Sequence, residues 1–463
     1  MRTELRANSL SFIESIVMGI AGSAPGYTIA VTIAVTTAAL IGAAGFLSPG
    51  SLIIFAVPML GIAVAYKALT KRMVNAGAAY DWTSRVFGKF FGYFSGWALL
   101  VASMVFMVTG SLPIATSTLN FIAPALTKSV VVTTGVATFW FLLIACVLIA
   151  GIKLTSKIQM VMSTIELVIL AVVAIAAFVH VGLHGATNPF SWSWFGFHYS
   201  AGGFAATALV VIFFYWGWDV TANLSEETKD AETNAGNGGF GSVFVTIVYY
   251  VAFTLAALLL FTTKAAQGYS DNIVYNIAVA SGLGRTGGLV ASIAVILSSI
   301  ATLETTMLQF SRTLFAMGRD GAMPTTFGAV DQRTETPVRA MYLLIGVGLV
   351  VLWVSSLMPT INVIITDSVN AIGIQVAYYY GLAGLVAAWM LRDLYKESVW
   401  RWIAFCLFPA ASAIFLFVMA LYTITTFNTI TNLVGIGGLV AGIVFFRPWR
   451  TTVPSAPAPA AAE

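Results

Sequence analysis

The segment Ile20–Ala30 reads IAGSAPGYTIA and lies inside a run that is long enough to cross a bilayer. That run, residues 11–47, contains one charged residue, Glu14. Proline lacks a backbone N–H, and glycine adopts conformations that interrupt a helix. Hydrocarbon cannot satisfy the freed backbone groups, so such a break persists only where it faces protein, water or a ligand. The segment therefore indicates either a proline kink in an ordinary span or a binding site within the membrane.

The composition is that of a polytopic membrane protein. Of the 463 residues, 59% are hydrophobic and 9% are charged, whereas soluble domains carry about 25% charged residues. Cys146 and Cys406 both lie in apolar runs, which favours buried free thiols over a disulfide or a metal site. No cleavable signal peptide is evident, and the glycine-rich stretch NGGFGS at 237–242 lacks a Walker-type lysine. We expect no metal, no bound nucleic acid and no cofactor except a coupling ion.

Apolar windows predict twelve membrane spans. They fall near residues 11–41, 50–68, 90–120, 129–150, 158–180, 202–225, 240–263, 286–317, 340–357, 361–391, 398–422 and 428–447. If the N-terminus lies in the cytoplasm, all but three of the 22 Lys and Arg residues fall in cytoplasmic segments. The exceptions are Lys128, Lys264 and Arg285. The positive-inside rule thus predicts a multi-pass protein of a bacterial-type plasma membrane with both termini cytoplasmic.

The sixth span contains a second candidate break. It reads ALVVIFFYWGWDVTANLSEE and carries Gly217 and Asp219. An acid within a span costs about 3 kcal/mol on insertion scales and indicates a functional site. If the first ten spans form two repeats of five, the second repeat is inverted, and spans one and six correspond. Paired interrupted spans in corresponding halves are the pattern of a secondary transporter's substrate site.

The expected fold is an all-α integral membrane protein with a 5+5 inverted repeat, broken helices 1 and 6, and two C-terminal helices. Its predicted parts are a cytoplasmic N-terminus (1–10), a first five-helix repeat (11–180), a second, inverted repeat (202–391), helices 11 and 12 (398–447) and a Pro/Ala-rich, disordered cytoplasmic tail (448–463).

Four stretches together resemble a known family. They are the Gly/Ser/Pro break, NAGAAYDWTSRVFGKFFGYFSGWALL (75–100), FFYWGWDVTANLSEETKD (213–230), and SRTLFAMGRDGAMP (311–324) with RTETPVRA (333–340). The chain resembles an amino acid–polyamine–organocation superfamily transporter of the bacterial amino acid permease type, over about residues 10–447. The resemblance implies a permease that imports an amino acid or related amine by alternating access. Proton coupling is expected, and a sodium symporter or an exchanger is the alternative.

The resemblance also implies the substrate-binding residues. The set is Gly22, Ser23, Ala24 and Gly26 at the first break, Phe213, Phe214, Tyr215, Trp216 and Gly217 at the second, and Tyr93 from the third span. The N–H groups of Ser23, Ala24 and Gly26 would bind a carboxylate, and carbonyls near Gly19, Phe213, Phe214 and Trp216 an ammonium, since helix ends favour these charges. Simple packing remains the alternative for the aromatic residues, and a membrane-interface position for Tyr93.

The candidate ion-coupling residues are Glu166, Asp219, Glu304, Ser298 and Ser299. Many proton-coupled relatives carry a lysine where this chain has Glu166, so coupling through lysine is excluded by the resemblance. A buried carboxyl group is still able to take up a proton. Ser298 and Ser299 stand where sodium-coupled relatives place hydroxyl ligands, but helix hydroxyls often bond their own backbone. We expect Glu226, Glu227 and Asp230 to form a solvated cytoplasmic region.

Two other classes of protein fit the sequence less well. A membrane-embedded enzyme would need a constellation of catalytic side chains at one depth, and none is evident. A channel would need a repeated filter-like segment, and two broken helices with bulky aromatic residues do not suit it. The expected partners are a small amino acid or amine and the lipid bilayer. No sequence pattern identifies the individual substrate or the oligomeric state.

Overall fold

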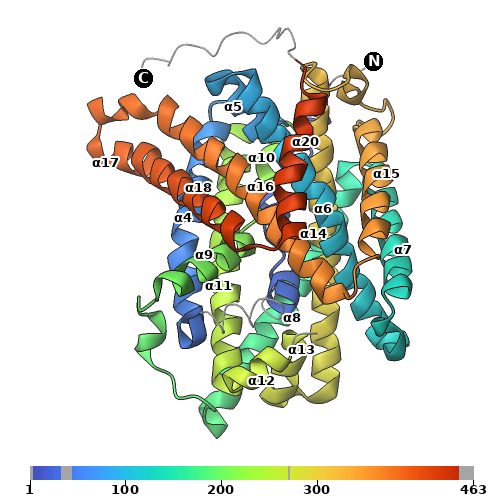
Figure 1. Ribbon diagram of the computed structural model, residues 1–463, viewed down its shortest axis with the longest axis vertical. Coiled ribbons are helices and arrows are strands. Elements are labelled where there is room, and N and C mark those ends of the chain that lie inside the picture. The colour runs from blue at the N-terminus through green and yellow to red at the C-terminus, as the bar shows by residue number, and fades with distance from the viewer. Residues whose placement is uncertain (1–3, 33–43, 270–271, 448–463) are drawn as a thin grey trace.

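The computed structural model describes residues 4–32, 44–269 and 272–447. Among these residues no strand is present. The β-type pairing that the structure shows there is a single isolated bridge between Leu10 and Thr228. The helices form one bundle, and the first and last described residues lie at the same end (Figure 1). The predicted all-α membrane fold is confirmed. The predicted disordered tail lies outside the described residues, and the division into two repeats stays a prediction.

Nine helical segments of the described residues are long and apolar enough to cross a membrane. Their main helices are α4 (Ser48–Thr70), α6 (Lys89–Ile122), α7 (Val130–Ile149), α8 (Ile152–His184), α11 (Ala231–Leu260), α14 (Gly284–Arg319), α15 (Val338–Ser355), α16 (Ile361–Met390) and α18 (Phe408–Thr426).

Three further segments complete the predicted twelve spans. Two are interrupted: α1 (Phe12–Ser23) with α2 (Pro25–Tyr27), and α9 (Ala201–Phe214) with α10 (Val220–Asn223). The third, Thr429–Phe445, is apolar but shorter, and it ends in α20 (Gly438–Phe445). Short helices connect or extend the spans, namely α5 (Ala79–Phe87), α12 (Thr263–Gly268), α13 (Ile273–Ala278), α17 (Val399–Trp402) and α19 (Thr429–Asn432).

The spans divide into a buried core and an outer layer. In α6, 94% of the most apolar window is buried within the molecule, against 28% in α8. The exposed residues of α8 are large and apolar and recur every three or four positions, as in Val161, Ile165, Val168, Val172 and Ile175. Such a stripe suits contact with lipid. The core helix α6 packs against α14 and α16 and so supports the interrupted spans from within.

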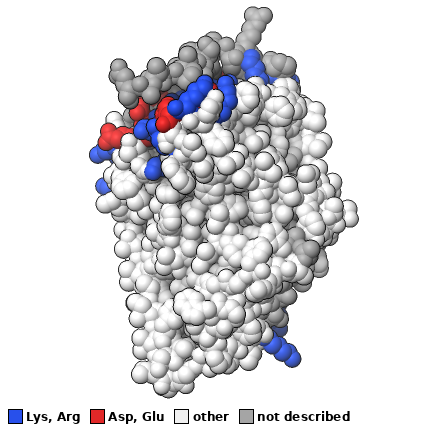
Figure 2. Space-filling view, turned by 90° about the vertical axis from the view of Figure 1, so that its left-hand side faces the viewer, with Lys and Arg blue, Asp and Glu red and all other residues white. Residues whose placement is uncertain are grey.

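Charged side chains mark the ends of the bundle. Lys, Arg, Asp and Glu gather at the end that carries the first and last described residues, which we call the charged end (Figure 2). A broad belt of uncharged side chains covers the rest of the visible face, with basic side chains again at the opposite end (Figure 2). This distribution matches a protein set across a bilayer.

Hydroxyl side chains cap several spans. Ser11 begins α1 with a capping box, in which its hydroxyl accepts from the Glu14 amide and its own amide donates to the Glu14 carboxylate, 2.8 Å away. Ser129 caps α7, Ser200 caps α9 and Thr360 caps α16, each through a side-chain oxygen that accepts from a backbone amide of the first turn. A cap satisfies amides that a helix start leaves free, and it fixes where each span begins.

The two interrupted spans touch at a pair of glycines. A Cβ atom added to Gly22 would overlap the carbonyl oxygen of Gly217, and one added to Gly217 would overlap that of Gly22. Gly217 also has φ of +103°, and Ala24, just beyond α1, has φ of +46°. Glycine is needed at both contact positions because only bare backbone allows two chains to approach so closely.

We predict that Gly217→Ala destabilises the protein strongly. The added methyl group would overlap the Gly22 backbone, and alanine disfavours the positive φ, so the free energy of unfolding should fall by about 3 kcal/mol. Gly346→Ala in α15 is the control, since nothing lies within 4 Å of its added Cβ. Thermal unfolding of the purified variants measures the effect. Equal melting temperatures for the two variants would contradict the proposed contact.

Candidate functional site

The first break follows from one proline. α1 ends at Ser23, Ala24 turns left-handed, and Pro25 begins α2. The Ala24 amide still donates to the Ile20 carbonyl at 2.8 Å. Pro25 has no N–H, so the Ala21 carbonyl loses its helical donor. That carbonyl is buried and has no hydrogen-bond partner among the described residues.

Neighbouring helices hold the other carbonyls of this break. Thr302 of α14 donates its hydroxyl to the Gly22 carbonyl at 2.9 Å. Tyr250 of α11 donates its phenol to the Ser23 carbonyl at 2.8 Å, and Thr28 donates to the same atom at 2.9 Å. Because hydrocarbon offers no partners, these side chains take the place of water.

The second break is a non-helical stretch between α9 and α10. The amides of Tyr215 and Trp216 donate to Ile212 and Phe213 at 3.3 and 3.1 Å, which tightens the last turn of α9. The chain then passes Gly217 and resumes helical form at Val220. The carbonyl of Phe214 and the amides of Gly217 and Trp218 are buried and have no hydrogen-bond partner within the described part of the chain.

The location of the free amides corrects one prediction. The amides of Ala24 and Gly26, expected to bind a carboxylate, donate instead to Ile20 and to the Glu166 carboxylate. Ser23 is the last residue of α1 and lies within the helix. The free donors belong to the second break, which the sequence pattern could not distinguish because both breaks contain glycine.

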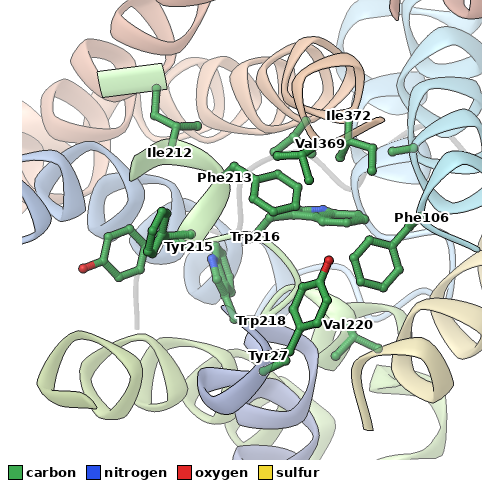
Figure 3. Close-up of a cluster of buried hydrophobic side chains, with 14 of the residues drawn as sticks. Tyr27, Phe106, Ile212, Phe213, Tyr215, Trp216, Trp218, Val220, Val369 and Ile372 are labelled. Carbon is green, nitrogen blue, oxygen red and sulfur yellow. The ribbon is translucent and has the colours of Figure 1, made fainter. Parts of the chain in front are cut away.

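Aromatic side chains surround the junction of the two breaks (Figure 3). Phe106 of α6 meets Trp216 edge to face at 5.3 Å between ring centroids, and Tyr27 meets Phe106 at 5.9 Å. Phe213 lies 6.1 Å from Trp216 by the same measure. Val369 and Ile372 of α16 complete the labelled group on one side (Figure 3). We call Tyr27, Phe106, Phe213 and Trp216 the aromatic cluster. None of its side chains carries a charge.

Tyr93 and Tyr215, both predicted to bind substrate, have other contacts. Tyr93 packs against Phe446 at 5.2 Å and Trp97 at 6.2 Å between centroids. It precedes Phe106 by 13 residues, or about 20 Å along a helix, so it lies well away from the aromatic cluster, and its role in substrate binding stays a prediction. Tyr215 sits in the break, but its phenol donates to the Leu52 carbonyl of α4 at 2.9 Å. It therefore anchors the break to α4.

The structure brings Glu166 of α8 to the first break. Its Oε1 accepts from the Gly26 amide at 3.0 Å. A Cβ on Gly26 would lie 3.3 Å from this oxygen, 3.2 Å from the Ala294 carbonyl and 3.0 Å from Ser298 Cβ. Glu166 Oε2 and Ser298 Oγ are buried without hydrogen-bond partners in the described chain. Ser299 bonds its own helix through the Val295 carbonyl, 2.8 Å away.

The other two predicted acids differ from Glu166 and from each other. Glu304 of α14 is buried, and neither of its oxygens has a hydrogen-bond partner among the described residues. Asp219, at the start of α10, accepts from Tyr379, Tyr380 and Gln309. Sequence reasoning missed these three donors. The run Tyr378–Tyr380 was the available signal, since three successive tyrosines within a span are unusual.

Two ion pairs lie at the charged end of the bundle, one buried and one partly exposed. Arg312 of α14 binds Glu227 through two hydrogen bonds of 2.9 Å, and both side chains are fully buried. Arg319 binds Glu226 at 2.7 and 3.0 Å, and Glu226 also accepts from the Ala76 amide. The prediction of a solvated region is therefore wrong for Glu227, whereas Glu226 is partly exposed and Asp230 is exposed. The basic partners of Glu226 and Glu227 follow about 85 to 95 residues later, beyond the reach of local patterns.

Comparison with known proteins gives consistent matches. The model of the amino acid permease family matches residues 10–446. The branched-chain amino acid permease BcaP of Lactococcus lactis is 28% identical over 331 residues, which cover 67% of this chain and 69% of that protein. The methylthioribose transporter of Bacillus subtilis is 27% identical over 311 residues, 64% and 65% of the two chains. The low-affinity putrescine importer PlaP of Escherichia coli is 22% identical over 432 residues, 89% and 88%.

We predict that Arg312→Met is much more destabilising than Arg401→Met. The first change leaves Glu227 buried without its partner, at a cost of about 3–5 kcal/mol. Arg401 and its partner Glu397 are exposed, and such pairs contribute less than about 1 kcal/mol. Thermal unfolding compares the two variants. The double variant Arg312→Met/Glu227→Leu should recover most of the loss, and a double variant as unstable as Arg312→Met would contradict the ion-pair explanation.

Proposed function

The chain belongs to the amino acid permease family, and on this basis we propose that it imports an amino acid or related amine across the plasma membrane by alternating access. It is a transporter of small molecules and not an enzyme. The relatives named above carry branched-chain amino acids, methylthioribose and putrescine by their names. The finer points, namely the direction, the coupling ion and the substrate-binding residues, belong to the proposal.

One observation carries the proposal. The breaks meet at Gly22 and Gly217, and buried backbone groups beside that contact have no partner among the described residues. Unpaired buried backbone groups are rare and need a ligand or water. The Gly217 and Trp218 amides suit a carboxylate, and the Ala21 and Phe214 carbonyls suit an ammonium group. An α-amino acid offers both charges, so backbone alone could bind its common part.

The aromatic cluster would then contact the variable part of the substrate. Its four side chains are uncharged, and Val369 and Ile372 lie beside them (Figure 3). Apolar walls favour a neutral side chain over an acidic one, because a charge there would lose its hydration without a partner. The same site would bind an amine through the free carbonyls.

We further propose that Glu166 couples transport to protons. It links α8 to the first break through the Gly26 amide at 3.0 Å. Taking up a proton would neutralise the carboxylate and weaken this charge-assisted bond. The first break would then be freer to move relative to α8. Sodium is the second candidate, because Glu166, Ser298 and the Ala294 carbonyl all lie beside Gly26, and Glu166 Oε2 and Ser298 Oγ have no hydrogen-bond partner among the described residues.

The proposed topology places the charged end in the cytoplasm. Basic side chains gather at this end on the face that Figure 2 shows, which agrees with the positive-inside rule. The ion pairs of Arg312 and Arg319 would close the cytoplasmic side, so substrate would enter the site from the opposite side. The inverted 5+5 repeat, with breaks in spans one and six, is part of this proposal.

We predict saturable, gradient-driven uptake in proteoliposomes. Radiolabelled samples of the twenty amino acids and of putrescine should include at least one substrate that accumulates above its external concentration when the outside is acidic. Gly26→Leu should abolish this uptake, because the larger side chain would collide with Ser298 and Glu166. Flux that rises linearly with concentration would instead identify a channel. Absence of uptake for every compound would contradict the proposed function.

We predict that Glu166→Gln separates exchange from accumulation. Glutamine has the same shape and still accepts from the Gly26 amide, so substrate should bind and exchange normally. It cannot take up a proton, and accumulation under a pH gradient should fall to the level without a gradient. Glu397→Gln is the matched control, since this exposed glutamate pairs with Arg401 and lies outside the two breaks.

Two outcomes decide between the ions. Glu166→Gln that still concentrates substrate under a proton gradient would exclude Glu166 as the proton carrier. Replacement of sodium by choline should leave wild-type uptake unchanged. Loss of uptake in choline would favour sodium, with Ser298 as the ligand to test next.

A further inference from the structure

We propose that Asp219 is a positioning residue that fixes the indole of Trp216 through Tyr379, and that this chain of hydrogen bonds sets which substrate side chains fit the site. The inference rests on the proposed function for its transport readout. The five side chains involved come from three regions of the sequence, at residues 216–219, 309 and 379–380.

Two successive hydrogen bonds connect Asp219 to Trp216 of the aromatic cluster, and two more hold the Asp219 carboxylate. Trp216 Nε1 donates to the Tyr379 oxygen at 2.6 Å, and the Tyr379 hydroxyl donates to Asp219 Oδ2 at 3.1 Å. Gln309 Nε2 donates to the same Oδ2 at 2.6 Å, and the Tyr380 hydroxyl donates to Oδ1 at 2.7 Å. All five side chains are buried.

The chemistry of the groups gives the chain a single direction. An indole nitrogen only donates, so the Tyr379 oxygen must accept from Trp216. The single O–H of Tyr379 is then directed to Asp219, and an ionised carboxylate only accepts. Gln309 must therefore present its amide nitrogen. Each donor has one acceptor. The Asp219 oxygen therefore sets the direction of the Tyr379 hydroxyl, and the Tyr379 oxygen sets the orientation of the Trp216 indole.

The orientation of Trp216 matters because this ring lies at the centre of the aromatic cluster (Figure 3). Its indole contacts Phe106 at 5.3 Å and Phe213 at 6.1 Å between centroids. A buried indole N–H without an acceptor is costly, so the bond to Tyr379 favours one orientation of the ring. A different orientation would change the space beside Phe106 where a substrate side chain would lie.

The chain also joins three helices around the second break. Asp219 directly precedes α10, Gln309 lies in α14, and Tyr379 and Tyr380 lie in α16. The role of Asp219 as an ion-coupling residue, expected from the sequence, remains a competing proposal. The positioning role and the coupling role require different properties of the Asp219 carboxylate. Positioning requires an acceptor oxygen facing Tyr379, whereas coupling requires a group that gains and loses a charge.

Adjacent tyrosines provide a matched pair of variants. Tyr379→Phe and Tyr380→Phe each remove one hydroxyl that donates to Asp219, but only the first breaks the bond to Trp216. The readout is the ratio of kcat/KM for the two best wild-type substrates among the twenty amino acids and putrescine, measured as exchange. Tyr379→Phe should change this ratio at least about fivefold. Tyr380→Phe should change it less than about twofold. Equal changes in the two variants, or none in Tyr379→Phe, would overturn the inference.

Variants of Asp219 separate positioning from coupling. In Asp219→Asn the carbonyl oxygen can face Tyr379 and Gln309, while the amide donates to the Tyr380 oxygen. This variant should keep both the substrate ratio and accumulation under a pH gradient. Asp219→Ala should shift the ratio as Tyr379→Phe does. A substrate ratio that stays unchanged in Asp219→Ala would overturn the positioning role.

A measurement without substrate keeps the test independent of transport. In protein labelled with ¹⁵N-tryptophan, the Trp216 indole signal is identified by its loss in Trp216→Phe. Tyr379→Phe should shift this signal upfield, because the N–H loses its acceptor, and Tyr380→Phe should leave it in place. An unmoved signal in Tyr379→Phe would overturn the inference. A shifted signal in a protein that transports none of the compounds would contradict only the proposed function.

Discussion

The contact between Gly22 and Gly217 is the constraint on which the rest of the structure depends. Two spans can touch through bare backbone only where both lack side chains, and each is interrupted near that point. An interrupted span cannot face lipid, because its free backbone groups would remain unsatisfied. This requirement explains why hydroxyl groups from α11 and α14 donate to carbonyls of the first break. The outer helices, by contrast, need only an apolar surface.

The buried acids have separate structural roles because each has different neighbours. Glu166 holds the first break against α8, Asp219 collects donors from α14 and α16, and Glu227 pairs with Arg312 at the charged end. Glu304 has no partner of its own among the described residues. Burial penalises each of these charges, and the differences between their partners decide which of them remain able to bind an ion. Hydropathy alone treats all four as similar interruptions of a span.

Local features of the sequence predicted much of this architecture. Runs of apolar residues located the twelve spans, and Pro25 with its glycines located the first break, because span length and helix interruption depend on neighbouring residues. Contacts between distant residues were not predictable in this way. Phe106, rather than Tyr93, reaches the site because helix rise, and not residue type, sets depth in the membrane. The free amides of the second break result from the backbone conformation at Gly217. Glycine permits this conformation but does not specify it, so the sequence could not predict it.

The ion pairs at the charged end have an electrical consequence. Arg312 with Glu227, and Arg319 with Glu226, are each neutral as a pair. A charge that moves through the membrane potential gains or loses about 2.3 kcal/mol per 100 mV, but a neutral pair that separates without crossing the field transfers no net charge. Opening this end should therefore be nearly insensitive to voltage. Any current that accompanies transport would then come from the net charge of the substrate and of the ion that is transported with it.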